Sequence, residues 1–163
     1  MRRVRALALV GVAAAAACPD ATWLEAENGK CYTLLDSAST RSQAECAALC
    51  GENVNASIVT IRSPAENAIA AALVDDAAFA WIGFYVMMAG EKRVWGRWAS
   101  ASTSDDAGDA PTFTKWAPGF PRNGCGAANC AAINSEGDWV DRPCVWPPDF
   151  EAFGWVHPRC MCE

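Results

Sequence analysis

The segment from Cys130 to Cys144 constrains the fold more than any other part of the chain. Ala131–Ile133 is a short apolar run that predicts a strand, and Trp139 begins a second run. Between them, Gly137 can adopt the positive φ that a tight turn requires. A hairpin of this kind places its two ends side by side. We therefore expect a disulfide between Cys130 and Cys144 that closes the hairpin.

Residues 1–17 have the composition of a secretory signal. Arg2, Arg3 and Arg5 precede the apolar run Ala6–Val12, and small alanines follow up to Ala17. The apolar run is shorter than the ~20 residues that cross a bilayer. We expect cleavage before Cys18, a secreted, extracellular protein with no membrane span, and one domain over residues 18–163.

The charge of the chain argues against nucleic acid as a partner. The formal net charge is -6, and loss of residues 1–17 removes three arginines and no acid, which gives -9. An acidic surface without a basic stripe repels nucleic acid and anionic lipid.

Nine cysteines in a secreted chain of 163 residues indicate a disulfide framework. Cys18 and Cys31 flank a hairpin-like segment, which suits a bridge between them. Two further pairs sit close together in sequence. Cys46 and Cys50 share one face of a predicted helix, and residues 160 and 162 share one face of a predicted strand. These two faces would carry two parallel bridges if the Cα atoms came within about 7 Å.

Capping and alternation patterns predict two helices and several strands. Thr40–Gln43 has the pattern of a capping box for a helix that Gly51 could end. Ser63, Pro64 and Glu66 are typical of a second helix start, and Ile69 and Leu73, with Ala70 and Val74 beside them, form its narrow apolar stripe. The predicted strands are Lys30–Leu35, Ile58–Ile61, Phe79–Phe84 and Val94–Trp98.

Three motifs occur in the order typical of one family. Trp81-Ile82-Gly83, the hairpin with Trp139-Val140-Asp141 and the final Cys160-Met161-Cys162-Glu163 together resemble the C-type lectin-like domain family in its long form. The resemblance implies an α+β fold with two helices, small antiparallel sheets, several disulfides and a long loop region. Ala99–Asn129, which has little regular pattern, matches that loop region.

The resemblance also bears on the cysteine pairing. It implies Cys50–Cys162, and it supports Cys18–Cys31 as the hairpin bridge of the long form. The sequence leaves Cys46 and Cys160 open between an extra bridge and two buried thiols. A zinc site made of these cysteines and His157 is disfavoured, because secretion favours oxidation. Cys125 is left unpaired and could join a second chain in a disulfide-linked dimer.

The residues that hold calcium and sugar in sugar-binding members are largely missing here. In the place of the family's Glu-Pro-Asn triplet stand Phe120, Pro121 and Arg122, followed by Asn123. Ala128 replaces the acid expected before the hairpin, and only Asp141 remains on the second strand. Calcium requires six to eight oxygen ligands, so we expect no metal at this primary site and no cofactor. Asp105, Asp106 and Asp109 are interpreted as a solvated acidic loop.

An aromatic insertion, Val145–Pro158, precedes the last strand. We expect its Trp146 and Phe150 to form a calcium-independent ligand surface with Phe120, Arg122, Asn123 and Asp141. The alternative is that the insertion covers the core. Asn55, in Asn-Ala-Ser, is a potential N-glycosylation site.

These observations predict a secreted recognition module for a carbohydrate or protein ligand. The alternative is a disulfide-stabilised structural or extracellular matrix protein without a small ligand. We do not expect an enzyme, because His157 is the only histidine and no nucleophile motif lies near it.

Overall fold

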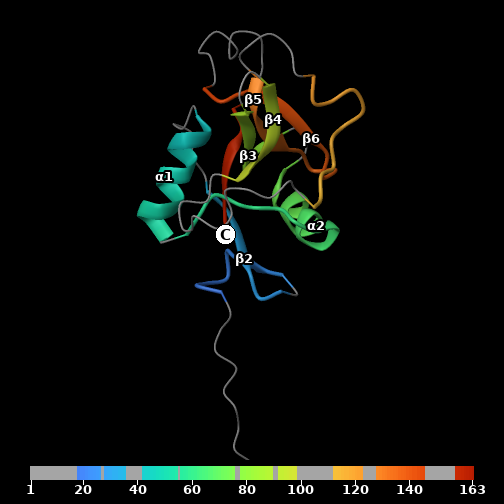
Figure 1. The fold of residues 1–163 in the computed structure, drawn as a ribbon. Helices are drawn as coiled ribbons and strands as arrows, with labels where there is room; N and C mark the ends of the chain where they lie inside the picture. Colours follow the sequence, from blue (N-terminus) through green and yellow to red (C-terminus); the bar gives the residue numbers. More distant parts are fainter. Residues whose placement is uncertain are drawn as a thin grey trace, which may run out of the picture.

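The computed structural model describes residues 18–26, 28–35, 42–54, 56–75, 78–89, 92–98, 112–122, 128–145 and 157–163. The fold is α+β: two helices, α1 (Gln43–Val54) and α2 (Pro64–Leu73), lie on either side of a central sheet (Figure 1). The strands are β1 (Leu24–Glu25), β2 (Cys31–Leu35), β3 (Ala80–Ala89), β4 (Lys92–Trp98), β5 (Ala128–Ile133), β6 (Trp139–Pro143) and β7 (Arg159–Cys162). None of the helices in these segments is long and apolar enough to span a membrane.

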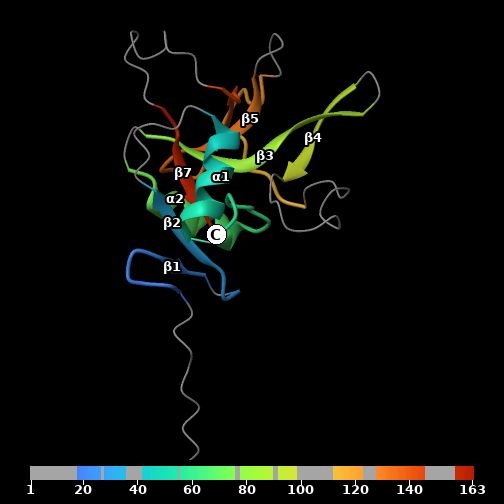
Figure 2. The same ribbon diagram turned by 90° about the vertical axis from the view of Figure 1, so that its left-hand side faces the viewer.

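The last strand, β7, occupies the centre of the sheet. The strand order is β1-β2-β7-β3-β5-β6, and β4 pairs with the outer part of β3. β2 is antiparallel to β7, whereas β7 and β3 are parallel, so the sheet is mixed rather than purely antiparallel. The β3–β4 hairpin extends away from the body of the molecule (Figure 2).

Residues of β3 alternate between two apolar clusters. Ile82 and Phe84 belong to the cluster on the α2 side, which also contains Trp139. Trp81 belongs to the cluster on the α1 side, which contains the cysteines of α1 and β7. Trp81, Ile82 and Phe84 are fully buried, as expected for neighbouring residues of a strand that is covered on both faces.

Helix α1 begins and ends later than its sequence pattern indicated. Ser42 Oγ accepts a hydrogen bond from Glu45 N (3.1 Å), so Ser42, two residues after Thr40, caps the helix. Gly51 does not end it, because α1 continues to Val54. One helical glycine costs only about 1 kcal/mol, and the two disulfides at Cys46 and Cys50 hold the turns of α1 that precede it.

Helix α2 starts as predicted and presents its predicted apolar stripe to the core. Ser63 Oγ accepts from Glu66 N (3.2 Å), and the proline follows at the first helical turn. Ala70, Ala71 and Val74 are buried, whereas Ile69 and Leu73 are only half-buried. The predicted stripe therefore faces the core, with Ala70 and Val74 buried and Ile69 and Leu73 packed against the cluster at its edge, and Ala71 is buried as well.

The segment predicted as a strand at 58–61 is extended but forms only an isolated bridge, between Ile58 and Cys162. Val59 explains why. Its N–H donates to Met161 O (3.0 Å), and its carbonyl accepts from Gly83 N (2.8 Å). The segment thus joins β7 to β3 through single residues instead of pairing along one strand.

Four disulfides cross-link the described residues. They join Cys18 with Cys31, Cys46 with Cys160, Cys50 with Cys162, and Cys130 with Cys144. The pair that the sequence left open, Cys46 and Cys160, is bonded, with its Cα atoms 5.1 Å apart. The four cysteines of α1 and β7 are therefore not available as zinc ligands. Cys125 and Asn55 lie outside the described residues.

The two bridges between α1 and β7 should be strongly coupled. They span nearly the same separation in sequence, 114 and 112 residues. With one bridge intact, the other closes only a short ring, so Cys46→Ala/Cys160→Ala or Cys50→Ala/Cys162→Ala should each lower the free energy of unfolding by about 2 kcal/mol. Removing both opens the long loop and should cost about 7 kcal/mol.

Urea denaturation of the two double variants and the quadruple variant measures this coupling. Cys18→Ala/Cys31→Ala is the matched control, because that bridge closes a separate hairpin and its loss should add to either of the others. A quadruple variant that loses only the sum of the two double-variant costs would contradict the shared-loop explanation.

Asn67 links helix α2 to the β5–β6 hairpin. Its Oδ1 accepts from Trp139 Nε1 (2.7 Å), and its Nδ2 donates to Gly137 O (2.9 Å). Gly137 has φ 78°, and a Cβ placed there would lie 2.6 Å from Asn67 Nδ2. The turn therefore requires glycine both for its backbone conformation and for the close approach of the amide.

Loss of this link should destabilise the hairpin. Asn67→Ala leaves the buried Trp139 N–H without its acceptor, and we expect a cost of about 1–3 kcal/mol. Gly137→Ala should cost at least as much, because it adds backbone strain. Thermal unfolding measures both changes, and Ala72→Ser, at an exposed position of α2, is the control. A Gly137→Ala protein as stable as wild type would disprove the close approach.

Polar side chains at the other end of the sheet tie the N-terminal hairpin to the last residue. Lys30 Nζ lies 3.0 Å from Glu163 Oε2, and Asn28 Nδ2 donates to Glu66 Oε1 (2.7 Å). Tyr32 is fully buried beside these carboxylates. Burial raises the pKa of Tyr32, and the charges of Glu163 and Glu66 raise it further.

Stability should therefore fall at alkaline pH. Above pH about 10 the unfolded tyrosine ionises while the folded one keeps its proton, so the free energy of unfolding falls by up to about 1.4 kcal/mol per pH unit from this residue. Tyr32→Phe cannot ionise, so its stability relative to wild type should rise across the same range. Chemical denaturation from about pH 9 to about pH 11 measures the free energy of unfolding of both proteins. A constant difference between wild type and Tyr32→Phe over this range would contradict the prediction.

Candidate functional site

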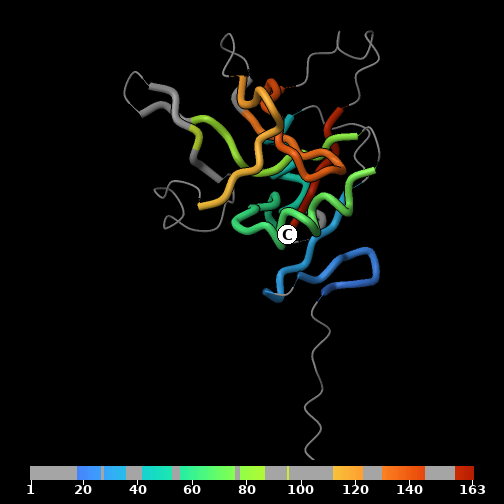
Figure 3. The backbone as a smooth tube through the Cα atoms, turned by 90° about the vertical axis from the view of Figure 1, so that its right-hand side faces the viewer, coloured from blue at the N-terminus to red at the C-terminus, as the bar shows by residue number. Residues whose placement is uncertain are grey.

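The segment 112–122 runs along the free edge of strand β6 (Figure 3). Trp139 N donates to Lys115 O (2.7 Å), and Ala117 N donates to Trp139 O (2.9 Å). Trp116 and Trp139 form a parallel bridge. The edge is thus paired at this point, and the residues that follow are presented from a fixed backbone.

A turn after Ala117 brings Phe120 back onto the molecule. Phe120 N donates to Ala117 O (2.9 Å), Gly119 has φ 81°, and the Phe120–Pro121 peptide bond is cis. The half-buried Phe120 ring packs against the α1-side cluster. The position of this ring consequently depends on the core beneath it.

Asp141 holds the end of the turn. It lies on β6 with only 4% of its surface exposed, and its Oδ1 accepts from the backbone N–H of Arg122 (3.1 Å). A buried carboxylate needs hydrogen-bond donors, and bonds to an ionised acceptor are stronger than neutral ones. Asp141 therefore acts as an anchor for the backbone of Arg122.

The guanidinium of Arg122 lies over the ring of Phe120. Its Cζ is 4.5 Å from the ring centroid, within the range of a cation–π interaction. The side chain is exposed, and it makes no ion pair or side-chain hydrogen bond in the described part of the chain. By contrast, Lys115 lies 3.1 Å from Asp138 and Arg159 lies 2.7 Å from Asp75.

A second guanidinium, that of Arg142, belongs to the same region. It is half-buried, and its Cζ lies 4.9 Å from the centroid of Phe79. Burial lowers the pKa of Arg142, Asp141 opposes that change, and the positive charge of Arg122 adds to the lowering. The two guanidinium groups thus act on each other electrostatically. We call Phe120, Arg122, Asp141 and Arg142 the arginine surface.

The oxygen donors of the arginine surface do not fit calcium. Asp141 supplies its only described carboxylate, and one oxygen of that carboxylate is used by the Arg122 N–H. Two positively charged groups adjoin it, whereas a calcium site requires several anionic or neutral oxygens. Within the described ranges, no group of three or more His, Cys, Asp or Glu residues could hold a metal. The acidic loop with Asp105, Asp106 and Asp109 lies outside those ranges.

The structure brings together three of the predicted site residues: Phe120, Arg122 and Asp141. Asn123, Trp146 and Phe150 lie outside the part of the chain that it describes. Sequence reasoning missed Arg142 and Phe79. Arg142 directly follows Asp141 in sequence, and its position on an edge strand was the available signal, whereas nothing local marks Phe79 as its partner.

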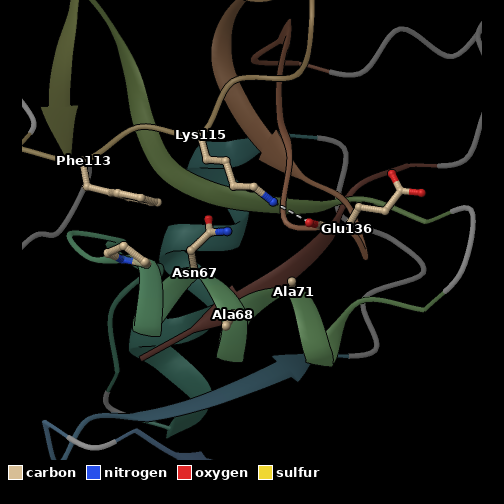
Figure 4. Close-up of a pocket in the computed structure, with 7 residues that line it drawn as sticks. Asn67, Ala68, Ala71, Phe113, Lys115 and Glu136 are labelled. Carbon is tan, nitrogen blue, oxygen red and sulfur yellow. Dashed lines mark hydrogen bonds between the residues drawn. The ribbon is translucent and has the colours of Figure 1, made fainter.

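A separate hollow of about 250 Å³ lies between α2 and the β5–β6 turn (Figure 4). Its lining is mostly apolar, with Phe113, Ala68 and Ala71 contributing. Lys115 at its rim donates to Glu136 O (2.6 Å) and also pairs with Asp138, and Asn67 is bonded within the hairpin as described above. The polar groups of this hollow are therefore largely occupied by the protein itself, and the arginine surface is the stronger candidate site.

Comparison with known proteins places the architecture in one family. The model of the Lectin C-type domain matches residues 39–150. The cow C-type carbohydrate-recognition domain of CD23, solved in the presence of GlcNAc2Man3 oligosaccharide, is 21% identical, with 89% of this chain and 93% of that chain covered and a TM-score of 0.63. The C-type lectin domain of murine dendritic cell inhibitory receptor 2, in complex with N-glycan, is 26% identical, with 89% and 96% covered and a TM-score of 0.62.

A third similar structure is a calcium-independent type II antifreeze protein, at 19% identity, with 89% of this chain and 95% of that chain covered and a TM-score of 0.60. The fold agrees with these comparisons. The chain belongs to the C-type lectin domain family.

Proposed function

We propose that this protein is a secreted recognition module that binds a carbohydrate or protein ligand at the arginine surface without calcium. The observation that carries the proposal is the arrangement around Asp141. Its carboxylate holds the Arg122 backbone, and the Arg122 guanidinium stands on Phe120. The chain itself thus supplies the positive charge that a metal would supply.

The family relationship supports ligand recognition and binding without catalysis. One of the similar structures is a complex with N-glycan, another was solved in the presence of an oligosaccharide, and a third protein of the same fold is described as calcium-independent. The four disulfides support an extracellular location, because such bonds persist in oxidising compartments. A disulfide-linked dimer through Cys125 is consistent with this location.

Ligand retention should not depend on calcium. We expect the mature protein to retain the same ligands, from an array of glycans and extracellular proteins, in calcium and in a chelator. Its melting temperature should not change on calcium addition, because the donor set at Asp141 does not suit the ion. Retention that disappears in chelator would contradict the proposal.

Asp141→Asn tests the role of the anchor. The amide keeps the shape of the side chain but weakens the charge-assisted bond to the Arg122 N–H, and we expect affinity to fall about tenfold. Glu136→Gln, on the exposed hairpin turn, is the matched control and should have no effect. The alternative function is that of a disulfide-stabilised structural protein. In that case wild type and both variants would fold normally but retain no ligand.

A further inference from the structure

We propose that the arginine surface selects glycans that carry a carboxylate or a sulfate, and that Arg122 is the residue that binds the acidic group. This inference rests on the proposed function and specifies its ligand class. It depends on three observations made on the described residues: the Arg122 guanidinium has no carboxylate partner, it lies over the Phe120 ring, and few large apolar side chains are exposed.

The guanidinium of Arg122 is available for a ligand. Lys30, Lys115 and Arg159 each lie within 3.1 Å of a carboxylate oxygen. The Arg122 guanidinium has no such partner among the described residues, although the chain as a whole has more acids than bases. In an acidic protein, an exposed arginine without a carboxylate partner in the described part of the chain is a candidate place for an external anion.

The orientation of the guanidinium leaves its hydrogen-bond donors exposed. The Cζ of Arg122 lies 4.5 Å from the centroid of the Phe120 ring, and the side chain is exposed; a guanidinium carries five N–H donors. A guanidinium held in this way can bind a carboxylate or sulfate through two parallel hydrogen bonds. Because its backbone is fixed by Asp141, little freedom is lost when the ligand binds.

The Asp141 carboxylate binds the backbone of Arg122 and does not take the place of an external anion at its guanidinium. That carboxylate is almost fully buried and accepts from the backbone of Arg122. Arg142, one residue further on β6, contributes a second positive charge to the region. Because Asp141 is buried, the exposed charge at this point of the described surface is that of Arg122.

The surface suits an acidic sugar better than an acidic protein. Protein interfaces have an apolar centre and a total area of about 1,200 Å² or more. Among the described residues, only Leu24 and Val145 are large, apolar and exposed, and they lie on different elements. A sugar with one charged group needs no apolar centre, because the charged pair and its hydroxyls provide the contacts.

The test is an array of glycans in matched sets that differ only in one group: a neutral sugar, its carboxylate form and its sulfate ester, all assayed in chelator. Acidic peptides are included as a separate arm. We expect wild type to retain the acidic members at least tenfold more tightly than the neutral ones. Comparison of the carboxylate and sulfate arms identifies which anion is preferred.

Arg122→Gln should abolish this preference, because it removes the charge. Arg122→Lys should restore it only in part, because lysine keeps the charge but lacks the planar pair of donors. Phe120→Leu should weaken binding of acidic glycans several-fold by removing the ring that orients the guanidinium. Arg62→Gln, an exposed arginine before α2, makes the same change in net charge and should have no effect.

Equal retention of neutral and acidic glycans, unchanged by Arg122→Gln, would overturn the ligand class and leave the proposed recognition function intact. Selective retention of acidic peptides would overturn the sugar assignment. An equal loss in Arg62→Gln and Arg122→Gln would show nonspecific charge attraction and overturn the site. No retention of any glycan or protein by folded wild type would overturn the proposed function as well. Unchanged circular dichroism and melting temperature establish that each variant is folded.

Discussion

The pair of disulfides between α1 and β7 is the constraint on which the rest of the structure depends. Four helical residues advance about 6 Å, and two strand residues advance about 6.6 Å. Two bridges with these spacings, 46 to 160 and 50 to 162, can form together only if the helix lies along the strand and runs in the same direction. They thereby build the α1-side cluster, and Phe120 of the arginine surface packs against that cluster.

Features with a strong local cause were predictable from the sequence. The β5–β6 hairpin follows from its glycine turn and cysteines, and the start of α2 follows from Ser63, Pro64 and Glu66. Features set by distant partners were not. The pairing of Cys46 with Cys160 was left open by the sequence, and residues 58–61 join β7 to β3 through Val59 instead of forming a strand. Local spacing cannot reveal such distant partners.

The candidate site illustrates the same division. In the sequence, Phe120 and Arg122 replace residues of the family's calcium-binding pattern, and Asp141 is retained from it. The sequence alone could not show that these three side chains contact one another. The structure shows Asp141 bonded to the backbone of Arg122, with the guanidinium on the neighbouring ring. Arg142 and Phe79 were not predictable, because their contact joins the end of β6 to the start of β3. The ring beneath a cation is a tertiary feature and has no signature in local spacing.

A guanidinium and a calcium ion offer different chemistry at the same kind of surface. Calcium accepts lone pairs from neutral hydroxyls in several directions, and its affinity depends on ionised carboxylate ligands. A guanidinium donates hydrogen bonds in one plane and stays charged throughout the range in which proteins are folded. It therefore favours ligands with two adjacent anionic oxygens over those with adjacent hydroxyls. When a surface loses its metal-binding carboxylates and gains an arginine fixed on a ring, the physical expectation is a change of ligand class and not simply a loss of binding.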